Sequence, residues 1–154
     1  MASRIPRFSR LLALRERELE EQKRLVAKAE QALREATLRV QEGQEALRKA
    51  ATGFRVEPGE SRLVQDFEVK SDWLKATVQA LEKLMEQRRF AEDRVRAQKG
   101  AQMKAERERR KVELLLEKIR EEERIALVRA EQKDTDEVAQ AKFSQLRDVR
   151  SSSH

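Results

Sequence analysis

Residues 12–54, LALRERELEEQKRLVAKAEQALREATLRVQEGQEALRKAATGF, carry the strongest structural signal in this chain. An apolar residue recurs there at every seventh position, at Leu12, Leu19, Val26, Leu33, Val40, Leu47 and Phe54. A second column, three residues on, is mostly small and reads Arg15, Gln22, Ala29, Ala36, Gly43 and Ala50. Such a repeat is typical of a coiled-coil helix, and small side chains beside it let another helix approach closely. The pattern predicts a first helix over about residues 8–52.

A break in the helical pattern follows this stretch. Gly53, Pro58 and Gly59 lie close together, and a proline disfavours helical geometry at the residue before it. We therefore expect a turn over residues 53–71, a second helix over about residues 72–146 capped by Ser71 or Asp72, and a frayed tail at 147–154. The second helix has its own apolar stripe, with alternating intervals of three and four residues, which is weak in the middle, where Arg88, Gln98, Gln102 and Arg109 occupy it.

The two predicted helices differ in length, about 65 Å for the first and about 110 Å for the second at 1.5 Å per residue. If they pack antiparallel, residues near 10 face residues near 113, and roughly 30 C-terminal residues extend beyond the end of the first helix. The predicted fold is all-α, a long antiparallel two-helix coiled-coil hairpin with a protruding C-terminal helix. We expect residues 1–154 to form a single coiled-coil domain.

The composition excludes several other classes of protein. Charged residues make up 42% of the chain and aromatic residues 4%, with four Gly and two Pro, which is too little turn-forming and β-forming sequence for a sandwich or barrel. There is no Cys, and the one His is the last residue, His154, so neither a metal site nor a cofactor is expected. Two paired helices enclose no cavity for a substrate, and an enzyme is not expected. No stretch reads as a membrane span or a signal peptide, which suggests a cytosolic protein.

The positive charge of the chain concentrates between Arg88 and Lys111, where ten basic residues meet four acidic ones. This block has two interpretations, an electrostatic footprint for nucleic acid or an ordinary solvated helix surface. Because single-strand readers stack bases on aromatic rings and the block holds only Phe90, nucleic-acid binding is not expected. Two apolar features each have two interpretations. Trp73 either closes the end of the hairpin or contacts a partner. Leu114 and Leu115, which are next to Leu116, are covered either by a partner or by a second copy of the chain.

Three segments carry a resemblance to a known family. They are FSRLLALRERELEE at residues 8–21, QALEKLMEQR at residues 79–88, and EQKDTDEVA at residues 131–139, with Phe143 shortly after. Together with the length, helix order and turn position, these segments resemble the FliJ family of flagellar export proteins and its counterpart in type III secretion, the SctO or YscO stalk proteins. In and just before the second segment, this chain has Thr77 where the family can carry an aromatic residue and Arg88 where it can carry a histidine.

The resemblance implies a non-enzymatic, cytoplasmic helical hairpin at the inner face of the bacterial cell membrane. It would act as the central stalk of a hexameric export ATPase, contact the cytoplasmic linker of the export-gate membrane protein and engage export chaperones. The implied ATPase-contact residues are Phe8, Leu11, Leu12, Val138 and Phe143. The implied export-gate contact residues are Thr77, Leu81, Leu84 and Arg88. The alternative function is a self-associating coiled-coil scaffold, and after it a basic nucleic-acid-binding coiled coil.

Overall fold

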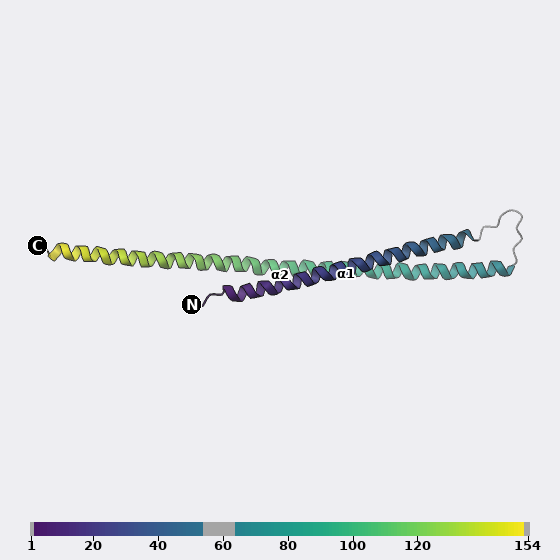
Figure 1. The fold of residues 1–154 in the computed structure, drawn as a ribbon, viewed down its shortest axis with the longest axis horizontal. Helices are drawn as coiled ribbons and strands as arrows, with labels where there is room; N and C mark the ends of the chain where they lie inside the picture. The colour runs from purple at the N-terminus through teal and green to yellow at the C-terminus, as the bar shows by residue number, and fades with distance from the viewer. Residues whose placement is uncertain (1, 54–63, 153–154) are drawn as a thin grey trace. The chain divides into compact units, whose positions relative to one another are not determined.

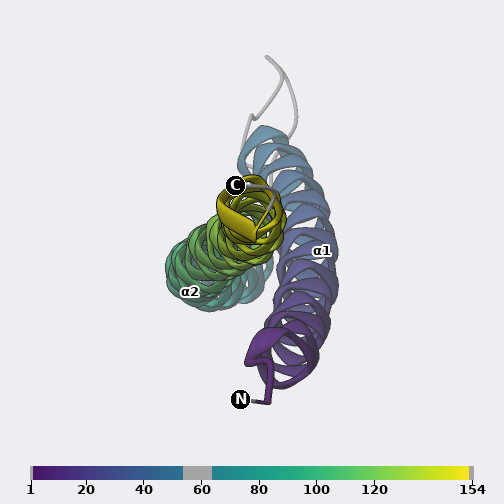
Figure 2. The ribbon, with the colours of Figure 1, turned by 90° about the vertical axis from the view of Figure 1, so that its left-hand side faces the viewer.

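The computed structural model describes residues 2–53 and 64–152 of the chain. Two helices account for almost all of these residues, α1 (Ile5–Thr52) and α2 (Val64–Ser152), and the described residues contain no strand (Figure 1). Figure 2 gives the same two helices in a view turned by 90°. The predicted all-α helical hairpin is confirmed, while the predicted bend at Pro58 lies outside the described residues.

The bounds of α2 differ from those expected. The helix begins at Val64 instead of residue 72, and residues 147–152 of the expected frayed tail are helical. Between Val64 and Ser71 there is neither Gly nor Pro to interrupt the backbone hydrogen bonds. The first turn of α2 contains the acidic Asp66, which complements the partial positive charge of a helix start. The last turn contains the basic Arg150, which complements the partial negative charge of a helix end. The helix therefore extends past the predicted capping residues.

Contacts within the chain divide it into two compact units, and α1 and α2 each contribute to both. The middle unit comprises Arg17–Glu106, and the terminal unit comprises Met1–Glu16 with Arg107–His154. The single domain expected from the sequence stays a prediction.

In the middle unit, α1 packs antiparallel on α2. The buried α1 residues are Leu19, Val26, Ala29, Ala36, Val40 and Ala50, which all belong to the two predicted columns, and Leu81 and Val95 are buried on α2. Glu30 forms an ion pair with Lys99 at 3.6 Å, and a Cβ added at Gly43 would lie 3.0 Å from Leu84 Cδ1. The second column of α1, with its small residues, therefore lets the backbone of α1 come close to side chains of α2, as the sequence predicted.

In the terminal unit, the buried residues Val112, Leu116 and Ile119 continue the stripe of α2. The first turns of α1 contribute the half-buried side chains of Ile5, Phe8, Leu11 and Leu12. The pairing is again antiparallel, since Ser3 meets Glu123. That register lies within a few residues of the one expected from helix lengths.

Polar residues also lie between the helices, in the second column of α1 and in the weak middle of the α2 stripe. Gln22 Oε1 in the middle unit and Arg109 Nε in the terminal unit are buried without a hydrogen-bond partner among the described residues. The other end of the Arg109 guanidinium pairs with Glu113, with 2.9 Å between Nη1 and Oε2. Buried polar atoms of this kind lower stability, and in coiled coils they restrict the register in which two helices can pair.

Candidate partner-binding surfaces

The last part of α2, residues 124–152, is exposed along its whole length, and we call it the exposed segment. Its large apolar side chains and their exposed fractions are Ile125 36%, Leu127 61%, Val128 47%, Val138 54%, Phe143 70%, Leu146 65% and Val149 65%. At 3.6 residues per turn these positions share about one half of the helix circumference, and residues such as Lys133 and Ser144 lie on the other half. The exposed segment is thus an amphipathic helix whose apolar face no described residue covers.

The five predicted ATPase-contact residues divide between two places in the terminal unit. Phe8, Leu11 and Leu12 are half-buried in the first turns of α1, whereas Val138 and Phe143 lie on the exposed segment. Pairing with α1 ends at Glu123, so Val138 lies about 22 Å and Phe143 about 30 Å farther along the helix axis. The structure therefore does not bring the two groups together as one patch.

The four predicted export-gate residues lie on α2 in the middle unit. Leu81 is 8% exposed, and its Cδ1 and that of Leu84 lie against Gly43, so these leucines hold α1 and α2 together. The Thr77 hydroxyl donates a hydrogen bond to the carbonyl of Trp73 at 2.8 Å, and Arg88 pairs with Glu92 at 3.7 Å. Thr77, Leu84 and Arg88 remain partly exposed, so the surface of this group open to a partner comes mainly from them.

The structure also shows how exposed Trp73 and the three consecutive leucines 114–116 are. Trp73 is 53% exposed, so part of its ring is open to a partner, and both interpretations of this residue stay predictions. Leu116 is 2% exposed, while Leu114 and Leu115 are 47% and 42% exposed. The stripe of α2 therefore buries one of the three leucines and leaves the other two partly open to solvent.

Most of the basic block is paired with carboxylates. Ion pairs involve Arg88, Arg96, Lys99, Arg109, Arg110 and Lys111, each with one acidic residue. Phe90 is 65% exposed and is the block's one aromatic ring. This arrangement is that of a solvated helix surface with neutralising pairs, and it gives no stacking platform for bases.

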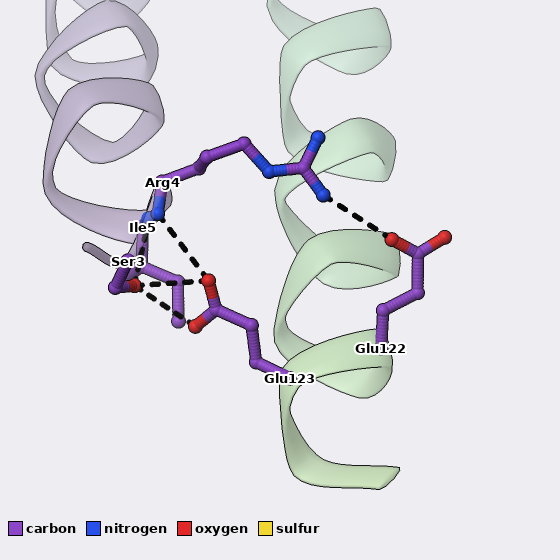
Figure 3. A network of polar contacts seen from close by, with 5 residues as sticks. All are labelled: Ser3, Arg4, Ile5, Glu122 and Glu123. Carbon is purple, nitrogen blue, oxygen red and sulfur yellow. Dashed lines mark hydrogen bonds and ion pairs between the residues drawn. The ribbon is translucent and has the colours of Figure 1, made fainter. Parts of the chain in front are cut away.

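The first turn of α1 is held on α2 by a group of polar contacts, which we call the clasp (Figure 3). The Ser3 hydroxyl donates to the Glu123 carboxylate, at 2.8 Å from Oε2 and 3.0 Å from Oε1. The Arg4 backbone N–H donates to Glu123 Oε1 at 3.3 Å, and the Ile5 N–H donates to Ser3 Oγ at 3.1 Å. The Arg4 guanidinium pairs with Glu122 at 3.4 Å. Ser3 and Glu123 were not expected from the sequence to form a pair or a site.

One signal in the sequence could have indicated the clasp. The intervals between Val112, Leu116, Ile119 and Glu123 continue the alternation of three and four residues, so Glu123 occupies a stripe position with a carboxylate in place of an apolar group. A carboxylate there requires donors on the facing helix, and the amino-terminal end of a helix has several N–H groups without intrahelical partners.

Neither α1 nor α2 is long and apolar enough, within the described residues, to cross a membrane. In the same part of the chain, no three acidic or histidine side chains gather as a group that could hold a metal ion.

Comparison with known protein families matches residues 3–147 to the family described as the flagellar FliJ protein. Comparison with curated proteins and with solved structures gives no match.

Proposed function

Because the chain belongs to the FliJ family and is a component of flagellar export, we propose that it is the non-enzymatic central stalk of the export ATPase complex. In this proposal its helical ends insert into a hexameric ATPase ring. It also contacts the cytoplasmic linker of the export-gate membrane protein and escorts export chaperones. Its location is the cytoplasm, at the inner face of the bacterial cell membrane.

The observation that carries the stalk proposal is the apolar face of the exposed segment. Phe143 and Leu146 are 70% and 65% exposed, although they belong to a face with regular helical spacing. Contiguous exposed apolar surface marks a site of association, because covering it removes apolar area from water. A ring that surrounds the exposed segment would cover this face, which supports insertion of this end of the chain.

The ends of both helices would then take part in different ways. Val138 and Phe143 would contact the ring directly, since their side chains are open to solvent. Phe8, Leu11 and Leu12 would contribute only the parts of their surfaces that α2 leaves exposed. We expect the exposed segment to contribute more binding energy than the first turns of α1.

A substitution on the exposed segment tests the ATPase contact. We expect Phe143→Asp to raise the concentration needed for half-maximal stimulation of the cognate ATPase by about tenfold or more, as for a central interface residue. Ser144→Asp is the matched control, because it places the same charge one residue away on the polar face. Leu11→Asp added to Phe143→Asp should abolish stimulation, with helicity measured by circular dichroism unchanged.

Full stimulation by Phe143→Asp would contradict the contact assignment. Sedimentation distinguishes the scaffold alternative: a dimer at micromolar concentration that Phe143→Asp dissociates would mean that a second copy of the chain covers the face. A stalk is expected to be monomeric under those conditions.

The export-gate contact is proposed at the partly exposed residues of its group. We expect Arg88→Glu to weaken binding of the purified gate linker, because the substitution reverses a charge whose side chain is 33% exposed. Lys83→Glu, an equal change of charge on the same helix, is the control. Equal binding by both variants and the unsubstituted protein would remove Arg88 from the contact.

A further inference from the structure

Glu123 stands where the packed part of α2 ends. Leu116 and Ile119 are each 2% exposed, Glu123 is half-buried, and every described residue after it is exposed. Both oxygens of its carboxylate accept a hydrogen bond from the Ser3 hydroxyl, and Oε1 accepts another from the Arg4 backbone N–H. A position that would otherwise continue the apolar stripe therefore binds the beginning of the facing helix.

The beginning of α1 needs such an acceptor. The first N–H groups of a helix lack intrahelical partners, and the partial positive charge there favours a nearby anion. The first turn of α1 contains no acidic residue, while Arg4, Arg7 and Arg10 add positive charge close to it. Ser3, two residues before the start of α1, caps the Ile5 N–H, and the negative charge comes from α2.

Within the clasp, Glu123 matters more than Glu122. The ion pair between Arg4 and Glu122 joins side chains that are 61% and 51% exposed, and exposed pairs of this kind contribute little. The Glu123 carboxylate instead accepts from a side chain and from the backbone at once, which fixes the position of the helix end as well as its charge.

We propose that Glu123 and Ser3 are positioning residues that attach the first turns of α1 to α2 and thereby hold Phe8, Leu11 and Leu12 in place. The attachment itself follows from the clasp and is independent of the ATPase. Its consequence for ring binding rests on the proposed function. A first turn that is already ordered loses less conformational entropy when a partner binds, so the clasp preorganises the amino-terminal part of the ATPase contact.

Spin-label distances test the attachment directly. The chain has no Cys, so nitroxide labels can be placed specifically at Arg10→Cys and Lys118→Cys, which are exposed positions on the two helices of the terminal unit. We expect one narrow distance distribution, which broadens toward longer distances in Glu123→Gln. Glu121→Gln is the matched control, since the Glu121 carboxylate pairs with Arg124 on its own helix and should leave the distribution unchanged.

A rescue variant separates attachment from simple capping. Ser3→Asp in a Glu123→Ala background returns an anion to the helix end, and the alanine side chain has no group that could rebuild the bridge to α2. We expect the amides of the first turns to exchange about fivefold faster in Glu123→Ala and to regain protection in the double variant, while the distance distribution stays broad. A narrow distribution in Glu123→Gln, or its restoration by Ser3→Asp in the Glu123→Ala background, would overturn the proposal.

ATPase stimulation then tests the consequence. We expect Glu123→Gln to raise the half-maximal concentration about fivefold with the maximal rate unchanged, and Glu121→Gln to have no effect. If the unsubstituted protein does not stimulate the ATPase, the stalk function fails while the spin-label result still decides the attachment. If Glu123→Gln broadens the distances and stimulates normally, the clasp does not position the ATPase contact.

Discussion

Residues 107–123 and residues 124–152 belong to the same helix and the same unit, yet their apolar side chains have opposite environments. Leu116 and Ile119 are 2% exposed, whereas Phe143 and Leu146 are 70% and 65% exposed. Both stretches carry apolar residues at helical spacing. The difference is the facing helix, which begins at Ile5, level with Glu123. A stripe of apolar residues therefore does not reveal whether its partner lies in the same chain or in another one.

Truncation is the most severe way to test this contrast. A chain that ends at Arg124 loses only exposed residues, so we expect its thermal midpoint to stay unchanged. A chain that ends at Leu115 also loses Leu116, Ile119 and the clasp, and we expect it to lose about 4 kcal/mol or more of unfolding free energy. Thermal unfolding of the two fragments checks this, and similar midpoints would mean that residues 116–124 are not part of the core.

Single substitutions sharpen the same comparison. We expect Leu116→Ala to lower the free energy of unfolding by about 2–5 kcal/mol, because it leaves a cavity between packed helices. Leu146→Ala removes the same atoms from an exposed side chain and should change it by less than about 0.5 kcal/mol. Urea unfolding of both variants measures the difference, and a cost for Leu146→Ala equal to that of Leu116→Ala would show that the exposed segment is packed in solution.

Two glycines extend the contrast to the middle unit. A Cβ at Gly100 would meet nothing within 4 Å, so Gly100→Ala should stabilise the helix by about 1 kcal/mol. A Cβ at Gly43 would lie 3.0 Å from Leu84 Cδ1 and 3.1 Å from Leu81 Cδ1. We expect the required side-chain shift to offset the helical gain in Gly43→Ala. Equal stabilisation by the two substitutions, measured by thermal unfolding, would contradict the close approach of α1 to α2.

Acidic pH should produce the smallest effect. Hydrogen bonds from Arg24, Arg48 and Arg124 hold the pKa values of Glu21, Glu45 and Glu121 below the ordinary glutamate value. The stabilisation is present above the unfolded pKa, about 4.3, and is lost as the pH falls through the lower folded pKa. The thermal midpoint should therefore fall between pH 7 and pH 3. Because all three carboxylates are exposed, a variant with Gln at the three positions should show a fall that is only slightly smaller. A large reduction would contradict the exposure of these pairs.

Much of the fold was predictable because it depends on local periodicity. Seven-residue spacing identified the two columns of α1. Leu19, Val26 and Val40 from the first column are buried, as are Ala29 and Ala36 from the second. The start of α2 was not predictable in the same way, since Ser71 and Asp72 are good capping residues that the helix includes in its interior.

The candidate surfaces were predictable only in part. Val138 and Phe143 were named from the family resemblance, and both are exposed, but Leu81 from the second group is buried against α1. The sequence shows that Leu81 belongs to the stripe of α2, but it does not show which part of that side chain a partner can reach. Ser3 and Glu123 were missed because they lie far apart in the sequence and neither belongs to a known motif.

The sequence by itself determined that the chain forms two long helices and which faces of them are apolar, because helix propensity and spacing act between residues three to seven positions apart. The tertiary structure decided where the packed stripe ends, which apolar residues remain in solvent and what Glu123 binds. Those outcomes depend on the register between α1 and α2, which is seen in the close approach at Gly43 in one unit and in the contacts of Glu123 with the beginning of α1 in the other.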